Sequence, residues 1–195
     1  MVEKDKMDRK TAVPALIGDP DDFLIVSGLA GASKDVGALT RGKPNAYQLA
    51  GVMGAAVMIG AGLALAQPDR RVLAVTGDGE LLMALGSLAT VAAMTLSNFS
   101  IVCVDNGRYG ETGYQVTHTD LGTDLTAVAS AAGIPNCREL NEMEDLADAA
   151  KLIRHSNATS FVLLKVSDAP PPQHKRSFDA AATKTAFRLA LLGEN

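Results

Sequence analysis

The stretch that decides the fold runs from Val75 to Gly113 and reads VTGDGELLMALGSLATVAAMTLSNFSIVCVDNGRYGETG. It opens with a strand-like apolar run that ends in Gly-Asp-Gly. It closes with a second apolar run that ends in Asp-Asn-Gly, and the residues between the two runs predict an apolar helix. The stretch therefore predicts a strand, a helix and a strand, with Asp78 and Asn106 at the two strand ends.

The same alternation extends on both sides of this stretch. Further strands are predicted at residues 23–28, 137–140 and 160–167, and helices at residues 46–66, 123–133, 142–156 and 177–193. Residues 31–42 predict a loop with about one helical turn, and residues 106–123 a long polar loop. Apolar strands that alternate with helices are typical of a parallel sheet covered on both faces. We therefore expect an α/β fold of three layers.

Composition limits the number of domains and the kinds of partner. The chain has 195 residues, of which 47% are hydrophobic and 21% charged, and its net charge is −4. We expect a single domain over residues 21–195, preceded by an N-terminal arm over residues 1–20. The negative charge argues against a nucleic-acid partner. Residues 46–66 are uncharged and long enough to span a bilayer, but they are rich in Ala and Gly, so a buried helix is preferred to a membrane segment.

The two cysteines and the first residues bear on the compartment. Cys103 and Cys137 lack the spacing of metal ligands, and Cys103 lies in a predicted strand. Free thiols in a reducing cytoplasm are the interpretation that follows. The first ten residues, MVEKDKMDRK, lack the apolar segment of a signal peptide. The sequence thus predicts a cytoplasmic protein.

The polar residues at the two strand ends predict a cation site. Asp78 and Asn106 lie 28 residues apart, which is about one βαβ unit. A right-handed crossover brings the ends of such neighbouring strands to the same edge of the sheet. A carboxylate and an amide carbonyl suit Mg²⁺ or Ca²⁺ rather than zinc, and Mg²⁺ usually completes its coordination with phosphate oxygens and water. A diphosphate is therefore the expected ligand, and Gly77 and Gly79 would let backbone amides approach it.

This motif resembles the diphosphate-binding motif of thiamine-diphosphate enzymes, in which Gly-Asp-Gly is followed by one or two asparagines. The similarity extends over roughly residues 22–170, and it implies the thiamine-diphosphate-binding fold. By this resemblance, Asp78, the side chain of Asn106 and the backbone carbonyl of Arg108 bind Mg²⁺. The residues implied to bind the cofactor are Gly51, Met53, Gly77, Asp78, Gly79, Glu80, Leu81, Asn106, Arg108, Tyr109 and Gly110.

Two of these residues leave alternatives open. Met53 lies 25 residues before Asp78, where the family places a bulky side chain between the two rings of the cofactor, and packing in the core is the alternative. The carbonyl of Gly51, two residues earlier, would accept a hydrogen bond from the aminopyrimidine. Glu80 stands where the family often has Ser or Ala. Its charge disfavours contact with a diphosphate, so Glu80 either points away or offsets a base.

The resemblance also implies a partner and an activity. Thiamine-diphosphate enzymes need a pyrimidine-binding domain that supplies a glutamate to the cofactor, and we find no second set of βαβ elements for it in this chain. A separate α-type subunit and an assembly of α₂β₂ or larger are therefore expected. The motif is similar to β-type subunits of sulfopyruvate decarboxylase and to the matching half of phosphonopyruvate decarboxylase, which implies decarboxylation of a small anionic 2-oxo acid. A carboligase of the acetolactate synthase type and a non-catalytic cofactor-holding subunit are the alternatives.

His118 is the candidate catalytic residue. It follows the predicted metal loop in the segment QVTHTD. Because histidine titrates near neutral pH, His118 could transfer a proton or bind an anion near the substrate, and exposure to solvent is the alternative. The segment GALTRGK at residues 37–43 nearly matches a P-loop, but Pro44 replaces the hydroxyl residue that would bind Mg²⁺, so no nucleotide site is predicted.

Overall fold

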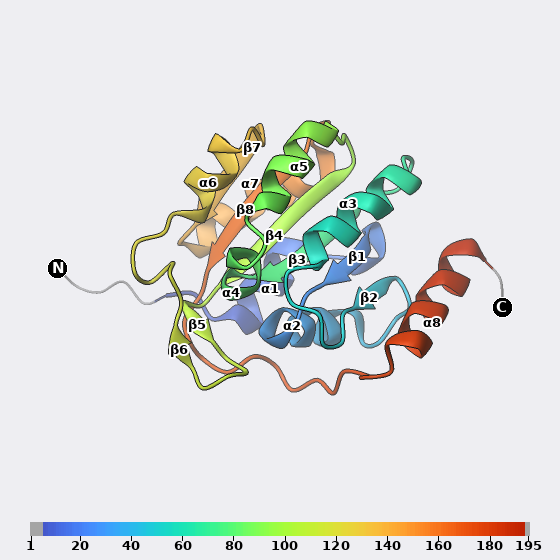
Figure 1. Cartoon of the computed structure of the whole chain (residues 1–195), viewed down its shortest axis with the longest axis horizontal. Coiled ribbons are helices and arrows are strands. Elements are labelled where there is room, and N and C mark those ends of the chain that lie inside the picture. The colour runs from blue at the N-terminus through green and yellow to red at the C-terminus, as the bar shows by residue number, and fades with distance from the viewer. Residues whose placement is uncertain (1–5, 194–195) are drawn as a thin grey trace.

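A six-stranded parallel sheet forms the middle layer of the molecule (Figure 1). The structure is a computed structural model that describes residues 6–193. Neighbouring strands run in the order β2-β1-β3-β4-β8-β7, and every pair is parallel. The strands are Leu24–Ser27 (β1), Ala46–Gln48 (β2), Val72–Gly77 (β3), Phe99–Asp105 (β4), Asn136–Leu140 (β7) and Ser160–Lys165 (β8). The predicted α/β fold with a parallel sheet is confirmed.

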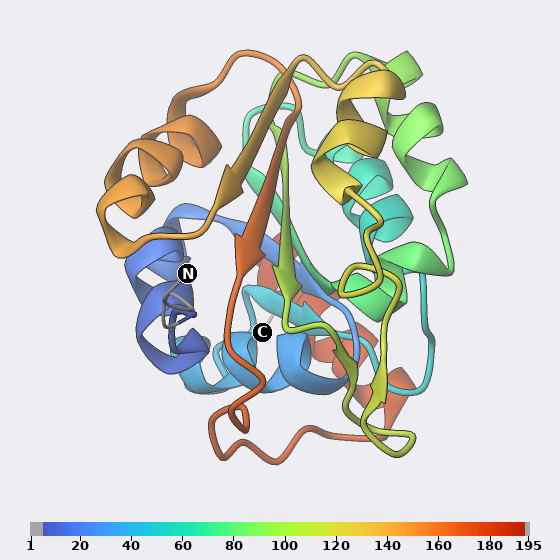
Figure 2. The ribbon, with the colours of Figure 1, turned by 90° about the vertical axis from the view of Figure 1, so that its left-hand side faces the viewer.

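Helices cover both faces of the sheet, and each face has its own hydrophobic core. The helices are Arg9–Ile17 (α1), Ala30–Thr40 (α2), Ala56–Ala66 (α3), Asp78–Leu82 (α4), Gly86–Met94 (α5), Leu125–Ala131 (α6), Leu146–His155 (α7) and Ala180–Leu192 (α8), with 3₁₀ turns at Pro20–Asp22 and Met143–Asp145. One core lies under α1, α2 and α7, and the other under α3, α5 and α6. Figure 2 shows α1 and α7 on one side of the strands and α3, α5 and α6 on the other. Successive side chains of the central strands enter opposite cores, as Val75 and Ala74 do.

The strand order creates a crevice at one edge of the sheet. From β1 the chain passes through α2 to β2 on one side, whereas from β3 it passes through α4 and α5 to β4 on the other. The segments that leave β1 and β3 therefore diverge. In open parallel sheets, ligands bind in the crevice that such a change of direction leaves beyond the carboxyl ends of the strands. Here the crevice lies between the residues that follow Ser27 and Gly77.

The predicted helix over residues 46–66 is wrong in its first half. Residues 46–48 form β2, which pairs with β1, and α3 begins at Ala56. Between them, Gly51 and Gly54 have φ values of 86° and 87°, which a right-handed helix does not allow. The expected burial is correct for one face of α3, which buries Val57 and Ala61, whereas Met58 and Leu65 are exposed. Glycine conformation divides the stretch into a strand, a loop and a helix.

Two other elements also differ from the prediction. Residues 31–42 were predicted as a loop with about one helical turn, but residues 30–40 form α2, whose buried side chains include Val36 and Asp35. Packing against the sheet therefore overcomes the weak helical propensity of its glycines. The single apolar helix predicted between the two strands of the Val75–Gly113 stretch is divided into α4 and α5, which are separated by residues 83–85.

The two ends of the described chain both contribute to the structure. Residues 9–17 of the predicted arm form α1, which buries Val13 and Leu16 in the core near α7, and residues 1–5 lie outside the described residues. After β8, a segment that we call the C-terminal strap (residues 167–179) runs below α2 to α8 (Figure 1). Within residues 6–193, no helix is long and apolar enough to cross a membrane.

The same substitution at two glycines of α3 is expected to change stability in opposite directions. A Cβ at Gly60 would lie 2.8 Å from Cε2 of the buried Phe99, whereas a Cβ at Gly62 would meet no atom within 4 Å. We expect Gly60→Ala to lower the free energy of unfolding by about 1–2 kcal/mol, because overpacking outweighs helix propensity. Gly62→Ala should raise it by up to about 1 kcal/mol. Urea denaturation of both variants tests this, and an increase in both would contradict the packing argument.

Candidate active site

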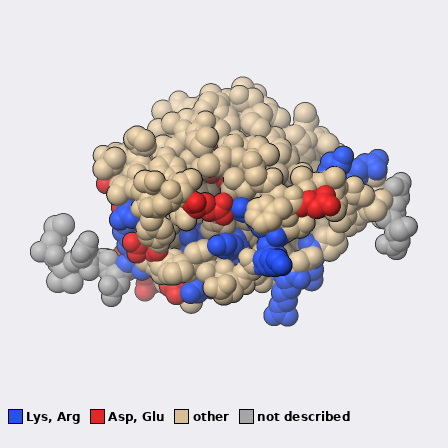
Figure 3. Space-filling model, turned by 60° about the horizontal axis from the view of Figure 1, so that its bottom comes forward, with Lys and Arg blue, Asp and Glu red and all other residues tan. Residues whose placement is uncertain are grey.

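A cavity of about 370 Å³ opens at the carboxyl ends of β1, β3 and β4. Its walls come from the start of α2, from residues 77–80 at the start of α4, and from the loop after β4, which carries the antiparallel hairpin of β5 (Arg108–Tyr109) and β6 (Gln115–Val116). Met53, Arg9 and Pro171 of the C-terminal strap complete the lining. The cavity thus lies in the crevice that the strand order creates. On this face of the molecule, acidic and basic side chains lie next to one another (Figure 3).

Asp78 is a buried acid on the wall of this cavity. It is the first residue of α4, and only 2% of its surface is exposed. Its Oδ2 accepts hydrogen bonds from the hydroxyls of Thr117 at 2.5 Å and Thr119 at 3.3 Å. Burial and the nearby negative charge of Asp105 raise the pKa of Asp78 to about 6. Among the described residues, no Lys, Arg or His side chain forms an ion pair with this carboxylate.

Asp105, the neighbouring acid, does have a cationic partner. It ends β4, and the parallel register places it opposite Lys165 at the end of β8. Its Oδ2 accepts a hydrogen bond from Nζ of Lys165 at 2.7 Å, while Oδ1 accepts from the hydroxyl of Thr119 at 2.8 Å and from the amide of Gly107 at 3.0 Å. Lys165 therefore balances the charge of Asp105, and Asp78 has no cationic partner among the described residues.

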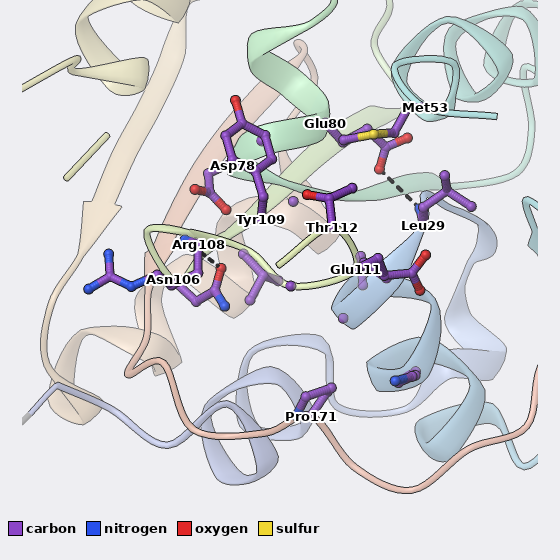
Figure 4. A pocket seen from close by; sticks show the side chains of 18 of the residues that line it. Leu29, Met53, Asp78, Glu80, Asn106, Arg108, Tyr109, Glu111, Thr112 and Pro171 are labelled. Carbon is purple, nitrogen blue, oxygen red and sulfur yellow. Dashed lines mark hydrogen bonds between the residues drawn. The ribbon is translucent and has the colours of Figure 1, made fainter. Parts of the chain in front are cut away.

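Asn106 and Arg108 are held by the sharp turn that follows β4. The Asn106 Oδ1 accepts a hydrogen bond from the amide of Arg108 at 3.3 Å, and Gly107 has a φ of 69°. The Arg108 guanidinium donates to the carbonyl of Gly107 and to Asp120. Figure 4 shows the side chains of Asp78 and Asn106 on the same side of the cavity. The structure therefore brings together the two predicted side-chain ligands, while the ligand role of the Arg108 carbonyl stays a prediction.

Glu80 joins two loops rather than pairing with a base. Its carboxylate accepts hydrogen bonds from the amide of Leu29, after β1, at 3.1 Å, and from the amide of Gly54, before α3, at 3.2 Å. Burial raises the pKa of Glu80, although these hydrogen bonds favour its charged form. A Cβ at Gly28 would lie 1.6 Å from Oε2 of Glu80, so glycine is needed there. Glu80 thus fixes the loop that carries Met53 to the loop that begins α2.

Of Gly51, Met53 and Leu81, which the resemblance implied to bind the cofactor, Met53 alone lines the cavity. Met53 lies on the side opposite Asp78 (Figure 4), and 38% of its surface is exposed. It belongs to neither of the two main cores, which argues against the packing alternative. Gly51 is exposed and is not part of the lining. Leu81 is buried in the core under α3 and α5, and it does not line the cavity either.

The hairpin places Tyr109 and Gly110 in the lining but leaves His118 outside it. A Cβ at Gly79 would lie 2.4 Å from Cε1 of Tyr109, so this glycine allows the aromatic ring to approach the start of α4. His118 is exposed, and its carbonyl accepts hydrogen bonds from the amides of residues 121 and 123. His118 thus lies in the turn that follows the hairpin, outside the cavity lining. Its catalytic role stays a prediction.

The sequence did not reveal several polar groups around the cavity. Arg9 is buried and lines the cavity, and its guanidinium forms a two-pronged ion pair with Asp35 of α2. The Arg9 guanidinium also occupies the space of a Cβ at Gly31, 2.3 Å away. Thr117, Thr119 and Lys165 were missed as well. A lysine at the end of an apolar strand was the one available signal for Lys165, whereas the threonines lie in a polar loop without periodicity.

The residues at this edge fit a divalent cation and a diphosphate. Asp78 supplies an unpaired buried carboxylate, and Asn106 supplies an amide oxygen on the same side. Within residues 6–193, no group of three or more His, Cys, Asp or Glu side chains could hold a metal ion. A cation here would therefore need backbone and ligand oxygens to complete its coordination, as Mg²⁺ does when it binds phosphates. Lys34 and Arg9 add positive charge to the lining.

Comparison with known proteins identifies the class of domain. Residues 30–166 match the family model described as thiamine pyrophosphate enzyme, C-terminal TPP binding domain. The chain therefore belongs to the thiamine pyrophosphate enzyme family. The matched residues include all those that the resemblance implied to bind the cofactor, from Gly51 to Gly110.

Two named relatives indicate which members of the family this chain resembles. The chain is 40% identical over 144 residues to a protein of Methanococcus maripaludis named sulfopyruvate decarboxylase subunit beta, and the match covers 74% of this chain and 76% of the relative. It is 35% identical over 159 residues to a phosphonopyruvate decarboxylase of Streptomyces viridochromogenes, which covers 81% of this chain and 39% of that protein. The predicted resemblance to these two groups is confirmed.

Solved structures support the fold. The thiamine diphosphate-dependent 4-hydroxybenzoylformate decarboxylase of Rhodococcus jostii superposes with a TM-score of 0.69 at 21% identity. The benzoylformate decarboxylase of Polynucleobacter necessarius gives a TM-score of 0.68 at 18% identity. The present chain corresponds to 34% of each of these longer chains. At this level of identity the likeness establishes the fold alone.

Proposed function

We propose that this chain is the diphosphate-binding subunit of a thiamine-diphosphate- and Mg²⁺-dependent decarboxylase that acts on a small anionic 2-oxo acid. The observation that carries the proposal is the unpaired buried carboxylate of Asp78 beside Asn106 at one cavity, in a chain 40% identical to a sulfopyruvate decarboxylase subunit. When bound, thiamine diphosphate supplies the site that accepts the electrons released as CO₂ leaves.

Each residue of the lining has a role in this proposal. Asp78, the side chain of Asn106 and the backbone carbonyl of Arg108 hold Mg²⁺, which in turn holds the diphosphate. Gly77 and Gly79 present backbone rather than side chain to it. Met53 contacts the rings of the cofactor, and its position depends on the hydrogen bond from Gly54, the next residue, to Glu80.

A second subunit completes the site in this proposal, in an assembly of α₂β₂ or larger. The partner would supply the glutamate that contacts the pyrimidine of the cofactor. Two observations support a partner. The relative in Methanococcus maripaludis is named as a beta subunit. Apolar side chains are also exposed near Met53: Val52, the preceding residue, is 50% exposed, and Met83, whose Cβ lies 3.9 Å from a Cβ built at Gly54, is 64% exposed. Such a patch beside a cavity is typical of an interface. The free thiols Cys103 and Cys137 support a reducing cytoplasm as the compartment.

The test is calorimetric titration of thiamine diphosphate with Mg²⁺ into this chain and into its complex with the partner with which it co-purifies. Product analysis with sulfopyruvate, phosphonopyruvate and pyruvate follows on the complex. Mg²⁺-dependent binding and release of CO₂ and free aldehyde from an anionic substrate are expected. A product with a new carbon–carbon bond would indicate a carboligase instead. Absence of binding in both samples would overturn the proposal.

Lys34 is expected to favour anionic substrates over neutral ones. Three cationic side chains line the cavity, and two of them are paired, Arg9 with Asp35 and Arg108 with Asp120. Lys34 forms no ion pair or hydrogen bond with any described residue. We expect Lys34→Met to raise KM for sulfopyruvate by about tenfold, the magnitude of one lost charge-assisted contact. KM for pyruvate should change less than threefold. An equal rise for both substrates, or a loss of cofactor affinity, would contradict this role.

A further inference from the structure

The loop that carries Asn106 returns to Asp78 through two threonines. Thr117 and Thr119 follow the hairpin, and both are buried although most of the hairpin is exposed. The amide of Thr117 donates to the carbonyl of Gly107 at 3.0 Å, which closes the loop at its base. The Thr117 hydroxyl then donates to Oδ2 of Asp78 at 2.5 Å. The first end of this loop therefore provides Asn106, and its last end contacts Asp78.

The hydrogen bonds extend beyond Thr117 in a short chain. The hydroxyls of Thr117 and Thr119 lie 2.9 Å apart, and the Thr119 hydroxyl also lies 2.8 Å from Oδ1 of Asp105. Asp105 has two other donors, Lys165 and the amide of Gly107. Thr117 gives its single proton to Oδ2 of Asp78, while Thr119 shares its single proton between the Thr117 oxygen and Oδ1 of Asp105. The Asp105–Lys165 ion pair thereby anchors Thr119 at the far end of the chain, and Thr119 in turn holds the Thr117 hydroxyl.

We propose that Thr117 is a positioning residue for the cation ligand Asp78, and that Thr119 and the Asp105–Lys165 pair hold Thr117 in place. Both threonine contacts fall on Oδ2 of Asp78, so neither hydroxyl competes for Oδ1. The fixed carboxylate can then present Oδ1 to a cation without losing side-chain rotational freedom on binding. The proposal rests on the proposed function, because it needs Asp78 to be a ligand of Mg²⁺.

Loss of the Thr117 hydrogen bond is expected to lower metal affinity measurably, for a reason that applies to metal sites in general. Groups that hydrogen-bond to a metal ligand fix its orientation, and their removal typically lowers metal affinity by about 10- to 100-fold. Here the effect should be selective for the hydroxyl, because the methyl group of Thr117 can be retained. Thr117→Val removes the donor and keeps the shape, while Thr117→Ser keeps the donor and removes the methyl group.

The experiment measures Mn²⁺ affinity by electron paramagnetic resonance, with thiamine diphosphate at saturation, on the complex of this chain with its partner. We expect Thr117→Val to weaken Mn²⁺ binding by about 10- to 100-fold, and Thr117→Ser to stay within about threefold of the wild type. Thr90→Val serves as the matched control, because Thr90 is exposed on α5 and its hydroxyl bonds to a carbonyl of its own helix. Thr119→Val should give an intermediate loss.

Three results would overturn the inference. Equal affinity of the wild type and Thr117→Val would leave Asp78 a ligand that needs no positioning, so the inference would fail while the proposed function stood. Equal losses for Thr117→Val and Thr117→Ser would indicate a packing role instead of a hydrogen bond. Failure of the wild-type complex to bind Mn²⁺ would remove Asp78 as a cation ligand, and the proposed function would fail together with the inference.

Discussion

Replacing Asp78 with asparagine is expected to stabilise the cofactor-free protein and to abolish Mg²⁺-dependent binding of thiamine diphosphate. Asparagine has nearly the same shape as aspartate, and its carbonyl can still accept the Thr117 hydroxyl. It lacks the negative charge, which is costly in the free protein because this carboxylate is buried beside Asp105 and unpaired. The same charge is what a divalent cation requires. We therefore expect at least a 100-fold loss of Mg²⁺-dependent cofactor affinity.

The stabilisation should depend on pH in a defined direction. The pKa of Asp78 is raised in the folded protein from its ordinary value of 3.8 to about 6, so the folded state binds the proton more tightly than the unfolded state. The contribution of Asp78 to stability is therefore most favourable below pH 4, and it is lost as the pH rises to about 6. Above that pH, Asp78→Asn should be more stable than the wild type by up to about 3 kcal/mol.

Thermal unfolding of both proteins without cofactor, at pH 4.5 and pH 8, measures this difference. The gap between Asp78→Asn and the wild type should widen at the higher pH. Asp148→Asn is the control, because Asp148 is fully exposed and pairs with Lys151 on the surface of α7. It should leave cofactor affinity unchanged. If Asp78→Asn destabilised the free protein at pH 8, the account of an unpaired buried charge would be wrong.

Replacing Glu80 with alanine is expected to produce the opposite result for stability and a similar loss of binding. The substitution leaves the amides of Leu29 and Gly54 without their acceptor, and each lies in a partly buried setting. An unsatisfied buried amide costs about 1–3 kcal/mol, so a loss of about 2–4 kcal/mol is expected for the pair. Release of the loop before α3 should also displace Met53 and weaken cofactor binding by about tenfold or more.

Glu80→Gln separates the hydrogen bonds from the charge. The amides of Leu29 and Gly54 bond to different oxygens of Glu80, and glutamine replaces one of these oxygens with an NH₂ group, so it can accept one of the two amides but not both. Its stability should therefore fall between those of the wild type and Glu80→Ala in urea denaturation. Backbone hydrogen exchange should show faster exchange at Leu29 and Gly54 in the alanine variant. If exchange stayed unchanged while binding fell, Glu80 would act on the ligand directly instead of through the two loops.

The sequence predicted the architecture well, because the four central strands β1, β3, β4 and β8 are mostly apolar. The apolar runs before Asp78 and Asn106 are typical of buried parallel strands. The right-handed crossover between them predicts that both strands end at the same edge of the sheet. The helix at residues 46–66 was mistaken because composition carries no information about backbone conformation at single glycines. Positive φ at Gly51 and Gly54 converts half of it into a strand and a loop.

The site was predictable where a motif carried it and hidden where the tertiary structure assembled it. The Gly-Asp-Gly segment and Asn106 are local signals, and the structure places both on the cavity. The hydrogen-bonded groups next to Asp78 come from three separate segments, which carry Asp105, the two threonines and Lys165. No local pattern in the sequence indicates the role of Thr117. Leu81 shows the converse error: it is next to the motif in sequence, but its helix turns it into the core.

The C-terminal strap bears on how related enzymes could diverge. The family match ends at residue 166, one residue before the strap begins. Yet Pro171 of the strap lines the cavity, the hydroxyl of Tyr114 donates to the carbonyl of Asp168, and Arg176 pairs with Glu111 at 3.1 Å. In the proposed function, the residues inside the family match hold the cofactor, while the strap, outside that match, shapes one wall of the cavity. We therefore expect that exchange of the strap between relatives would alter substrate choice at that wall and leave cofactor binding in place.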